Sequence, residues 1–254
     1  MISSPNEAIE AFHLAFLAQL SKDPNKVVVK GGQNLRFFFE SVRHSDDLDM
    51  DVSVTALQTL KSKVNKILAS PRFRKTVLLY GIEIVKVSMP KQTDTVRRWK
   101  LEMKVKGLTD PVHTKMEFSR RETEAKPKLD PVAKPIADAY GASPFSAAHY
   151  DLAESISQKI SALADPKRNK TRDLFDLAML VERYAKDVGA VTTLHPPKDQ
   201  TRDALRLASE MTFDAYKAEV LPYLAKAKRK EHGSLESWEG KRAIVIGALE
   251  IFSR

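Results

Sequence analysis

The segment from residue 47 to residue 54 alternates strictly between polar and apolar residues, and this pattern constrains the fold more than any other. Its apolar positions are Leu48, Met50, Val52 and Val54, and its polar positions are Asp47, Asp49, Asp51 and Ser53. Successive side chains of a β-strand point to opposite faces of the sheet. The segment is therefore predicted to be a half-buried strand, and burial of one face fixes its register.

The rest of the N-terminal half combines short strands with amphipathic helices. Apolar residues at helical spacing, with Ser4 as N-cap and Glu7 three residues later, predict a first helix that ends at Leu20. Further strands are predicted at residues 27–29, 77–87, 98–106 and 112–119, and further helices at 33–42 and 56–69. Three or four antiparallel strands are expected between residues 77 and 119.

A proline-rich segment divides the chain. Residues 126–135, KPKLDPVAKP, contain three prolines and predict an extended connection rather than a regular element. Beyond it the pattern is helical, at residues 151–163, 171–188, 199–224 and 234–252. The predicted fold is α/β (α+β), with a mixed sheet in an N-terminal domain, residues 1–130, and a helical bundle in a C-terminal domain, residues 135–254.

Composition excludes several kinds of chemistry. The 254 residues include no cysteine, which rules out disulfides, thiolate metal sites and cysteine nucleophiles. No signal-peptide pattern is visible and no apolar run reaches 18 residues, so a soluble cytoplasmic protein with no membrane partner is expected. With 42 Lys and Arg against 33 Asp and Glu, the formal net charge is +9, which favours nucleic acid or nucleotides as partners.

The strongest functional signal joins a double glycine to the aspartates. Gly31 and Gly32 stand between a predicted strand and a predicted helix, where backbone N–H groups can hold phosphate. Aligned carboxylates repel one another, and a divalent cation such as Mg²⁺, completed by water and substrate phosphates, reverses that repulsion. The alternative is a solvated acidic edge, which the buried opposite face of the strand makes less favourable.

Two blocks of residues resemble a known family. The first is Lys30-Gly-Gly-Gln-Asn-Leu-Arg36 followed by Arg43-His-Ser45-Asp-Asp47-Leu-Asp49, and the second is Lys159-Ile160 followed by Arg172-Asp173-Leu-Phe-Asp176. Together they resemble the AbiEii-type nucleotidyltransferases, the toxins of abortive-infection (type IV) toxin–antitoxin systems. Gln33 and Asn34 depart from the family pattern, which usually has small residues there, and this departure is expected to alter nucleotide contacts.

The resemblance implies a catalytic site. Asp47 and Asp49 would hold Mg²⁺ against the triphosphate of an NTP substrate, and the Ser45 hydroxyl would face the same phosphates. Gly31 and Gly32 would belong to the nucleotide-binding turn. The acceptor in the family, where established, is the 3′ end of tRNA, and nucleotides added there block translation. A cognate antitoxin is implied as a further partner.

Of three further implied residues, Asp173 and Glu117 have a second interpretation. Lys159 would contribute a positive charge to the phosphates, with Asp173 beside it in the active-site cleft. As structure alone, Asp173 is a first-turn acid that stabilises its helix, with Thr171 as N-cap. Glu117 would be a third metal ligand, or an exposed carboxylate paired with Lys115 or Arg120 across the sheet.

Basic residues outside the motifs offer candidate RNA contacts. Residues 97–128 hold ten Lys and Arg against five acids, and this face is expected to adjoin the catalytic strand. Trp238 and the run from Lys226 to His232 could grip RNA or could form a solvated helix end. Phe37, Phe38 and Phe39 are predicted to pack against the sheet rather than stack on bases.

Three functions remain open on the sequence. The first is a Mg²⁺-dependent nucleotidyltransferase toxin that modifies tRNA. The second uses the same metal site on a small molecule or a protein hydroxyl. The third is a non-catalytic, basic nucleic-acid-binding module, which would not need aligned carboxylates that weaken polyanion binding.

Overall fold

The computed structural model describes residues 2–22, 27–52, 57–120, 126–168, 170–187 and 194–254. The chain forms two compact units, which are described separately below. Unit 1 comprises residues 1–40 and 44–150, and unit 2 comprises residues 41–43 and 151–254.

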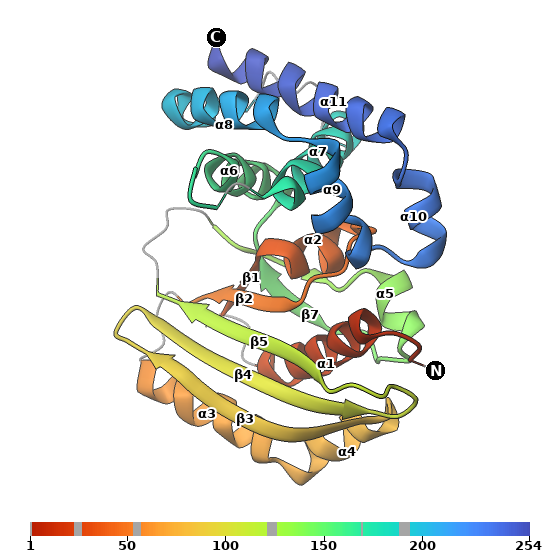
Figure 1. Ribbon diagram of the computed structural model, residues 1–254. Coiled ribbons are helices and arrows are strands. Elements are labelled where there is room, and N and C mark those ends of the chain that lie inside the picture. The colour runs from red at the N-terminus through yellow and green to blue at the C-terminus, as the bar shows by residue number, and fades with distance from the viewer. Residues whose placement is uncertain (1, 23–26, 53–56, 121–125, 169, 188–193) are drawn as a thin grey trace. The chain divides into compact units, whose positions relative to one another are not determined.

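Unit 1 is built on a seven-stranded mixed sheet (Figure 1). The strand order is β3-β4-β5-β2-β1-β7-β6. The strands are β1 (Val28–Lys30), β2 (Asp47–Asp51), β3 (Ile82–Gln92), β4 (Val96–Val105), β5 (Val112–Ser119), β6 (Lys128–Pro131) and β7 (Ser146–His149). The alternating segment is thus confirmed as strand β2, which pairs antiparallel with β1 and parallel with β5. Residues 53 and 54 lie outside the described residues.

Within the described part of unit 1, five helices accompany the sheet. They are α1 (Pro5–Leu20), α2 (Gly31–Phe39), α3 (Leu57–Ala69), α4 (Pro71–Leu79) and α5 (Lys134–Ala139). The core cluster joins α1, α3 and α4 to the apolar side of the sheet, and the aromatic contacts Phe12–Phe73 and Trp99–Phe118 lie within it. Because Leu48 and Met50 of β2 are fully buried in this core, the intervening aspartates face the opposite side.

The predicted first helix is confirmed. Pro5 stands in the first turn of α1, and the Ser4 hydroxyl accepts a hydrogen bond from the backbone N–H of Glu7 at 3.3 Å. The Glu7 carboxylate accepts from the backbone N–H of Ser3 at 2.7 Å, so both ends of the predicted capping pair are used. This cap supplies partners to N–H groups that a helix start leaves without intrahelical bonds.

Two predicted boundaries in the N-terminal half are wrong. Residues 77–79 belong to the end of α4 rather than to a strand, and β3 begins only at Ile82. Ser70 caps α4, so Pro71 starts a helix as well as following one. The second predicted helix begins two residues earlier, at Gly31, and ends at Phe39, because Glu40 adopts the left-handed conformation with φ 55°.

The prediction that the proline-rich segment has no regular element is also wrong. Residues 128–131 form β6, which pairs with the unpredicted strand β7, and α5 follows from Lys134. Pro131 is tolerated because β6 is an edge strand of the sheet. Since β6, α5 and β7 all belong to unit 1, that unit extends to Tyr150, beyond the predicted boundary at residues 130–135.

In its described residues, unit 2 is helical apart from an isolated bridge between Arg43 and Leu224. Its helices are α6 (Leu152–Leu163), α7 (Thr171–Asp187), α8 (Lys198–Glu210), α9 (Phe213–Glu219), the 3₁₀ turn η3 (Leu221–Tyr223), α10 (Lys226–His232) and α11 (Leu235–Ser253). The predicted helix over residues 199–224 is broken after α8, because Met211 is extended and Thr212 caps α9. Among the described residues, no helix is long and apolar enough to cross a membrane.

Candidate active site

Strand β2 places its aspartates among charged residues of its neighbours. In the register of β2 and β5, Asp47 lies opposite Lys115 and Asp49 lies opposite Glu117. On the other side of β2, Asp49 lies opposite Lys30 of β1. Directly opposite residues share a face of the sheet. The predicted common face of Asp47 and Asp49 is therefore confirmed, and it also carries Lys30, Lys115 and Glu117.

Asp49 stands out because its carboxylate has no hydrogen bond or ion pair to any described residue. Burial raises its pKa, and the neighbouring carboxylates of Asp47 and Glu117 raise it further, against the opposing charges of Lys115 and Lys30. A Cβ atom at Gly31 would lie only 3.3 Å from Oδ2 of Asp49. The backbone of the glycine turn thus passes directly beside this carboxylate.

The two carboxylates that flank Asp49 have basic partners. Asp47 Oδ2 lies 2.8 Å from Nζ of Lys115, and Glu117 Oε2 lies 2.5 Å from a guanidinium nitrogen of Arg98. Glu117 therefore makes a cross-strand ion pair, with Arg98 rather than with Lys115 or Arg120. Its role as a metal ligand stays a prediction, since in the described part of the chain no three His, Asp or Glu side chains form a ready metal-binding group.

Asp51, the third aspartate of the row, has a structural position. Its carboxylate accepts hydrogen bonds from Lys30 Nζ at 2.5 Å and from the Tyr150 hydroxyl at 2.9 Å. Its side chain is only 7% exposed. Asp51 therefore ties β1 and the end of β7 to β2, which leaves Asp47 and Asp49 as the accessible pair.

The glycine turn lies between β1 and α2, as predicted, and Ser45 precedes β2. Gly31 has φ +67°, a left-handed conformation that favours glycine, and helix α2 begins there. Gly32 follows in the first turn of the same helix. The Ser45 hydroxyl donates to the backbone carbonyl of Asp47 at 3.1 Å, so it orders the entry to β2 while its oxygen can still accept.

Gln33 and Asn34, the departures from the family pattern, are structural. Gln33 Nε2 lies 2.7 Å from His13 Nδ1 and also donates to the carbonyl of Ser45. His13 Nε2 lies 2.8 Å from the Thr114 hydroxyl, which donates to the carbonyl of Asp46. Burial lowers the His13 pKa to about 3, so the imidazole is neutral and can relay these bonds.

Asn34 Nδ2 donates to the carbonyl of Tyr150 at 3.0 Å. Gln33 thus holds the entry to β2 and Asn34 holds the end of β7, and their expected effect on nucleotide contacts stays a prediction. Sequence reasoning missed the relay, although His13 on the apolar stripe of α1 was a signal for it.

Unit 2 contains its own buried charge cluster. Nζ of Lys159 lies 2.8 Å from Oδ1 of Asp173 and 2.6 Å from Oδ2 of Asp176. Arg43 donates two hydrogen bonds to Asp176, at 2.8 and 2.6 Å. Burial alone would raise the pKa of both aspartates, but these cations, with Arg168 at Asp173, hold the pKa of each well below its usual range.

The cluster brings both motif blocks together within unit 2. Arg43 comes from the first block, and Lys159, Asp173 and Asp176 come from the second. The sequence did not indicate the Arg43–Asp176 pair, because 133 residues separate the partners. Thr171 is the first residue of α7, and the Glu219 carboxylate accepts from both its N–H and its hydroxyl. A phosphate contact of Lys159 stays a prediction.

Other candidate residues have structural roles. Trp238 is 2% exposed and packs on Tyr216 with ring centroids 4.9 Å apart, so it is not available to grip RNA. Phe37 is fully buried in the core of unit 1, which confirms that it packs rather than stacks on bases. Residues 226–232 form helix α10.

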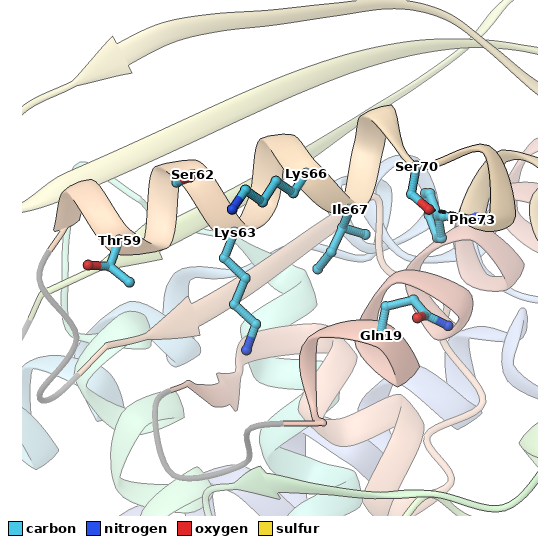
Figure 2. A pocket seen from close by; sticks show the side chains of 8 residues that line it. All are labelled: Gln19, Thr59, Ser62, Lys63, Lys66, Ile67, Ser70 and Phe73. Carbon is cyan, nitrogen blue, oxygen red and sulfur yellow. Dashed lines mark hydrogen bonds between the residues drawn. The ribbon is translucent and has the colours of Figure 1, made fainter.

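Unit 1 also has a cavity of about 410 Å³ between the end of α1 and helices α3 and α4. Figure 2 shows Lys63 and Lys66 extending from α3, with Gln19 on α1. None of the predicted site residues lines this cavity. The candidate site is therefore the polar face of β2 and β5 rather than this hollow.

The donor set on β2 suits a divalent cation. Hard cations such as Mg²⁺ take one or two carboxylates from the protein and complete their coordination with water and phosphate oxygens. Asp47 and Asp49 offer such a pair, and the Asp49 carboxylate, beside a glycine turn, has no hydrogen-bond partner among the described residues. This fold and site, a mixed sheet with a double-glycine turn ahead of paired strand carboxylates, define the class of nucleotidyltransferases.

Comparisons with known proteins agree with this class. Over its whole length the chain resembles the crystal structure of JHP933 from Helicobacter pylori, with a TM-score of 0.65 and 19% identity over 94% of that chain. A second structure, described as that of a proposed nucleotidyltransferase from H. pylori, also matches, with a TM-score of 0.65 and 19% identity. The match covers 99% of this chain and 96% of that chain. These likenesses show the fold. No curated protein matches the sequence.

The family follows from the sequence profile. The profile of the nucleotidyl transferase AbiEii toxins of type IV toxin–antitoxin systems matches residues 15–235. The chain therefore belongs to this family of toxins and is a nucleotidyltransferase. The match includes β2 with both aspartates, and it includes the charge cluster of unit 2.

Proposed function

We propose that this chain transfers a nucleoside monophosphate from an NTP to an RNA acceptor, the 3′ end of tRNA, in a Mg²⁺-dependent reaction that blocks translation. The observation that carries the proposal is the pair Asp47 and Asp49 on the polar face of β2, beside a turn where a Cβ atom on Gly31 would lie 3.3 Å from Asp49 Oδ2. Family membership supports an NTP as substrate and an antitoxin as partner. We place this chemistry in the cytoplasm, where tRNA is charged.

Asp47 and Asp49 would hold Mg²⁺, which when bound offsets negative charge on the phosphates of the substrate. Burial and the carboxylates of Asp47 and Glu117 raise the pKa of Asp49, and a bound cation would favour its charged form. Asp47 already attracts a cation, since Lys115 Nζ lies 2.8 Å from it. Glu117 of β5 would add a third carboxylate to the site, and the ion pair with Arg98 partly offsets its negative charge.

The glycine turn and Ser45 would orient the triphosphate. Gly31 and Gly32 open α2, whose N-terminal N–H groups can donate to phosphate oxygens. Transfer forms a bond between the acceptor hydroxyl oxygen and the α-phosphorus, breaks the bond to pyrophosphate and releases the hydroxyl proton to water. Lys159 and Asp173 are proposed as contributors on the family motif, with unit 2 supplying acceptor contacts.

The RNA acceptor is supported by charge on the same face of the sheet. Lys86 and Lys91 of β3 are exposed, and they lie opposite Glu102 and Arg98 of β4. Of the basic stretch 97–128, residues 121–125 lie outside the described residues. Lysines on the face of the sheet that carries Asp47 and Asp49 favour a polyanionic acceptor over a neutral small molecule.

The test supplies each of the four labelled NTPs to the purified protein together with total tRNA and Mg²⁺. We expect label at the tRNA 3′ end, and we expect Asp49→Asn and Asp47→Asn each to lower the rate by about 10²–10³-fold. Asp110→Asn, an exposed carboxylate in the turn after β4, is the matched control and should retain activity. EDTA should abolish transfer by the native protein.

The outcomes separate the competing functions. Label on a protein or small molecule, with none on RNA, would replace the tRNA assignment. Growth inhibition that persists unchanged in Asp49→Asn would favour a non-catalytic binding module.

A further inference from the structure

A row of three charged residues crosses the polar face of the sheet beside Asp49. Asp47 of β2 lies opposite Lys115 of β5, and Lys115 lies opposite Lys100 of β4. Neighbouring strands are about 4.8 Å apart, so the row spans roughly 10 Å from Asp47 to Lys100. Long lysine side chains on such a row can reach several oxygens of one polyphosphate.

Lys100 and Lys115 lie directly opposite each other across β4 and β5. Elsewhere between β4 and β5, Arg98 lies opposite Glu117 and Glu102 lies opposite His113. Like charges directly opposite on a sheet are destabilising. On its other side Lys100 faces Ser88, and it forms no ion pair with a described residue. The pair Lys100–Lys115 thus carries two positive charges, of which the ion pair with Asp47 offsets one.

Lys115 is held at the acidic pair by a weak contact. Its Nζ lies 2.8 Å from Asp47, but the two side chains are 27% and 38% exposed. Exposed ion pairs of this kind contribute little, so a polyanion or a cation at Asp47 can displace the lysine at small cost. Once displaced, Lys115 can turn toward Lys100 and the solvent side of the row.

We propose that Lys100 and Lys115 form a pyrophosphate-binding subsite that holds the β- and γ-phosphates of the NTP, and that Lys115 occupies Asp47 until a cation and the nucleotide bind. The subsite rests on the proposed function for its place in the reaction. Ammonium groups form charge-assisted hydrogen bonds with phosphate oxygens. The same charges would retain the pyrophosphate leaving group beside the α-phosphorus.

The experiment titrates the full-length protein with inorganic pyrophosphate in the presence of Mg²⁺, by calorimetry. Lys100→Met and Lys115→Met should each weaken pyrophosphate binding by about tenfold, and the double variant by about a hundredfold. Binding of a nucleoside monophosphate should change less than twofold. Lys104→Met is the matched control, because Lys104 is exposed on the same strand and face but lies opposite Glu83.

A second measurement tests the position of Lys115 at Asp47. Without nucleotide, Lys115→Met should bind Mn²⁺ several-fold more tightly than the native protein, since the lysine no longer competes for Asp47, while Lys104→Met should not. A lysine with a merely structural role would not strengthen metal binding while weakening pyrophosphate binding.

The results distinguish this subsite from the proposed function. If RNA is labelled normally and the double variant binds pyrophosphate as the native protein does, the subsite is wrong and the function stands. If no RNA is labelled but the variants lose pyrophosphate binding, the subsite stands and the acceptor is wrong. A native protein that binds no pyrophosphate would overturn the subsite directly.

Discussion

The Cα of Gly31 lies so close to Asp49 that a methyl group at this glycine would sit 3.3 Å from the Oδ2 oxygen of the aspartate. The two residues come from different elements, the start of α2 and the middle of β2. Their approach places backbone N–H groups that can bind phosphate beside a carboxylate that can bind a cation.

Gly31→Ala should therefore remove activity out of proportion to its effect on stability. A left-handed conformation costs a non-glycine residue about 1–2 kcal/mol, and the added methyl group would also displace Asp49. The checks are tRNA labelling and urea denaturation of the variant. Gly141→Ala is the control, because Gly141 has φ +57° but nothing within 4 Å of its Cβ position. Equal activity losses in both variants would contradict this role of Gly31.

Asp49→Asn should stabilise the protein at pH 7 while it lowers the transfer rate. Burial and the neighbouring carboxylates raise the Asp49 pKa, so folding disfavours the charged form. The native protein therefore loses stability as pH rises above the ordinary carboxyl pKa of 3.8, and the variant does not. Urea denaturation at several pH values should show a gain at pH 7 that disappears below that pKa.

Two controls accompany this variant. Asp51→Asn, two residues away, should destabilise by about 1–3 kcal/mol, because it weakens the bonds to Lys30 and Tyr150. Added Mg²⁺ should raise the melting temperature of the native protein but not that of Asp49→Asn. A melting temperature that rises equally in both would place the cation elsewhere.

Asp176→Asn should destabilise unit 2 by about 3–5 kcal/mol, because it leaves the buried guanidinium of Arg43 without its carboxylate and Lys159 with Asp173 alone. Asp187→Asn on the same helix removes an exposed pair with Arg183 and should cost less than about 0.5 kcal/mol. Thermal unfolding followed by circular dichroism compares the two variants. Similar melting temperatures would show that the buried cluster contributes no more than a surface pair.

The Glu10 carboxylate in α1 should make the stability of unit 1 fall at acidic pH. Burial alone would raise its pKa, but hydrogen bonds from His44 and Arg36 lower it from 4.5 to about 2. The resulting stability, about 3 kcal/mol, is present above pH 4.5 and is lost as pH falls toward 2. Glu10→Gln should flatten this part of the pH–stability curve. Glu83→Gln, an exposed position, should leave the curve unchanged.

Much of the fold was predictable because it depends on local patterns. Strict alternation predicted β2, and helical spacing with a Ser4 cap predicted α1. Strands β6 and β7 were missed because β6, Lys128–Pro131, is exposed along its whole length. It also contains Asp and Pro, which are common in turns. An edge strand that is exposed on both faces lacks the alternation of buried and exposed residues by which a strand is predicted.

The candidate site was predictable in part for the same reason. The sequence placed Asp47 and Asp49 on one face, and the register with β5 agrees. It could not show that the Asp51 carboxylate accepts hydrogen bonds from Lys30 and Tyr150, since these partners lie 21 and 99 residues away in the sequence. Nor could it select Arg98 over Lys115 as the partner of Glu117, because that choice depends on the alignment of β4 with β5.

The amino-acid sequence alone determined that three aspartates would share one side of a strand, with two glycines ahead of them. The reason is that side-chain alternation is a property of the extended backbone itself. Only the tertiary structure decided which of those aspartates keeps a free carboxylate and which is neutralised by a cation. That outcome depends on which strands lie side by side and in what register, and pairing between distant segments is set by packing of the whole core.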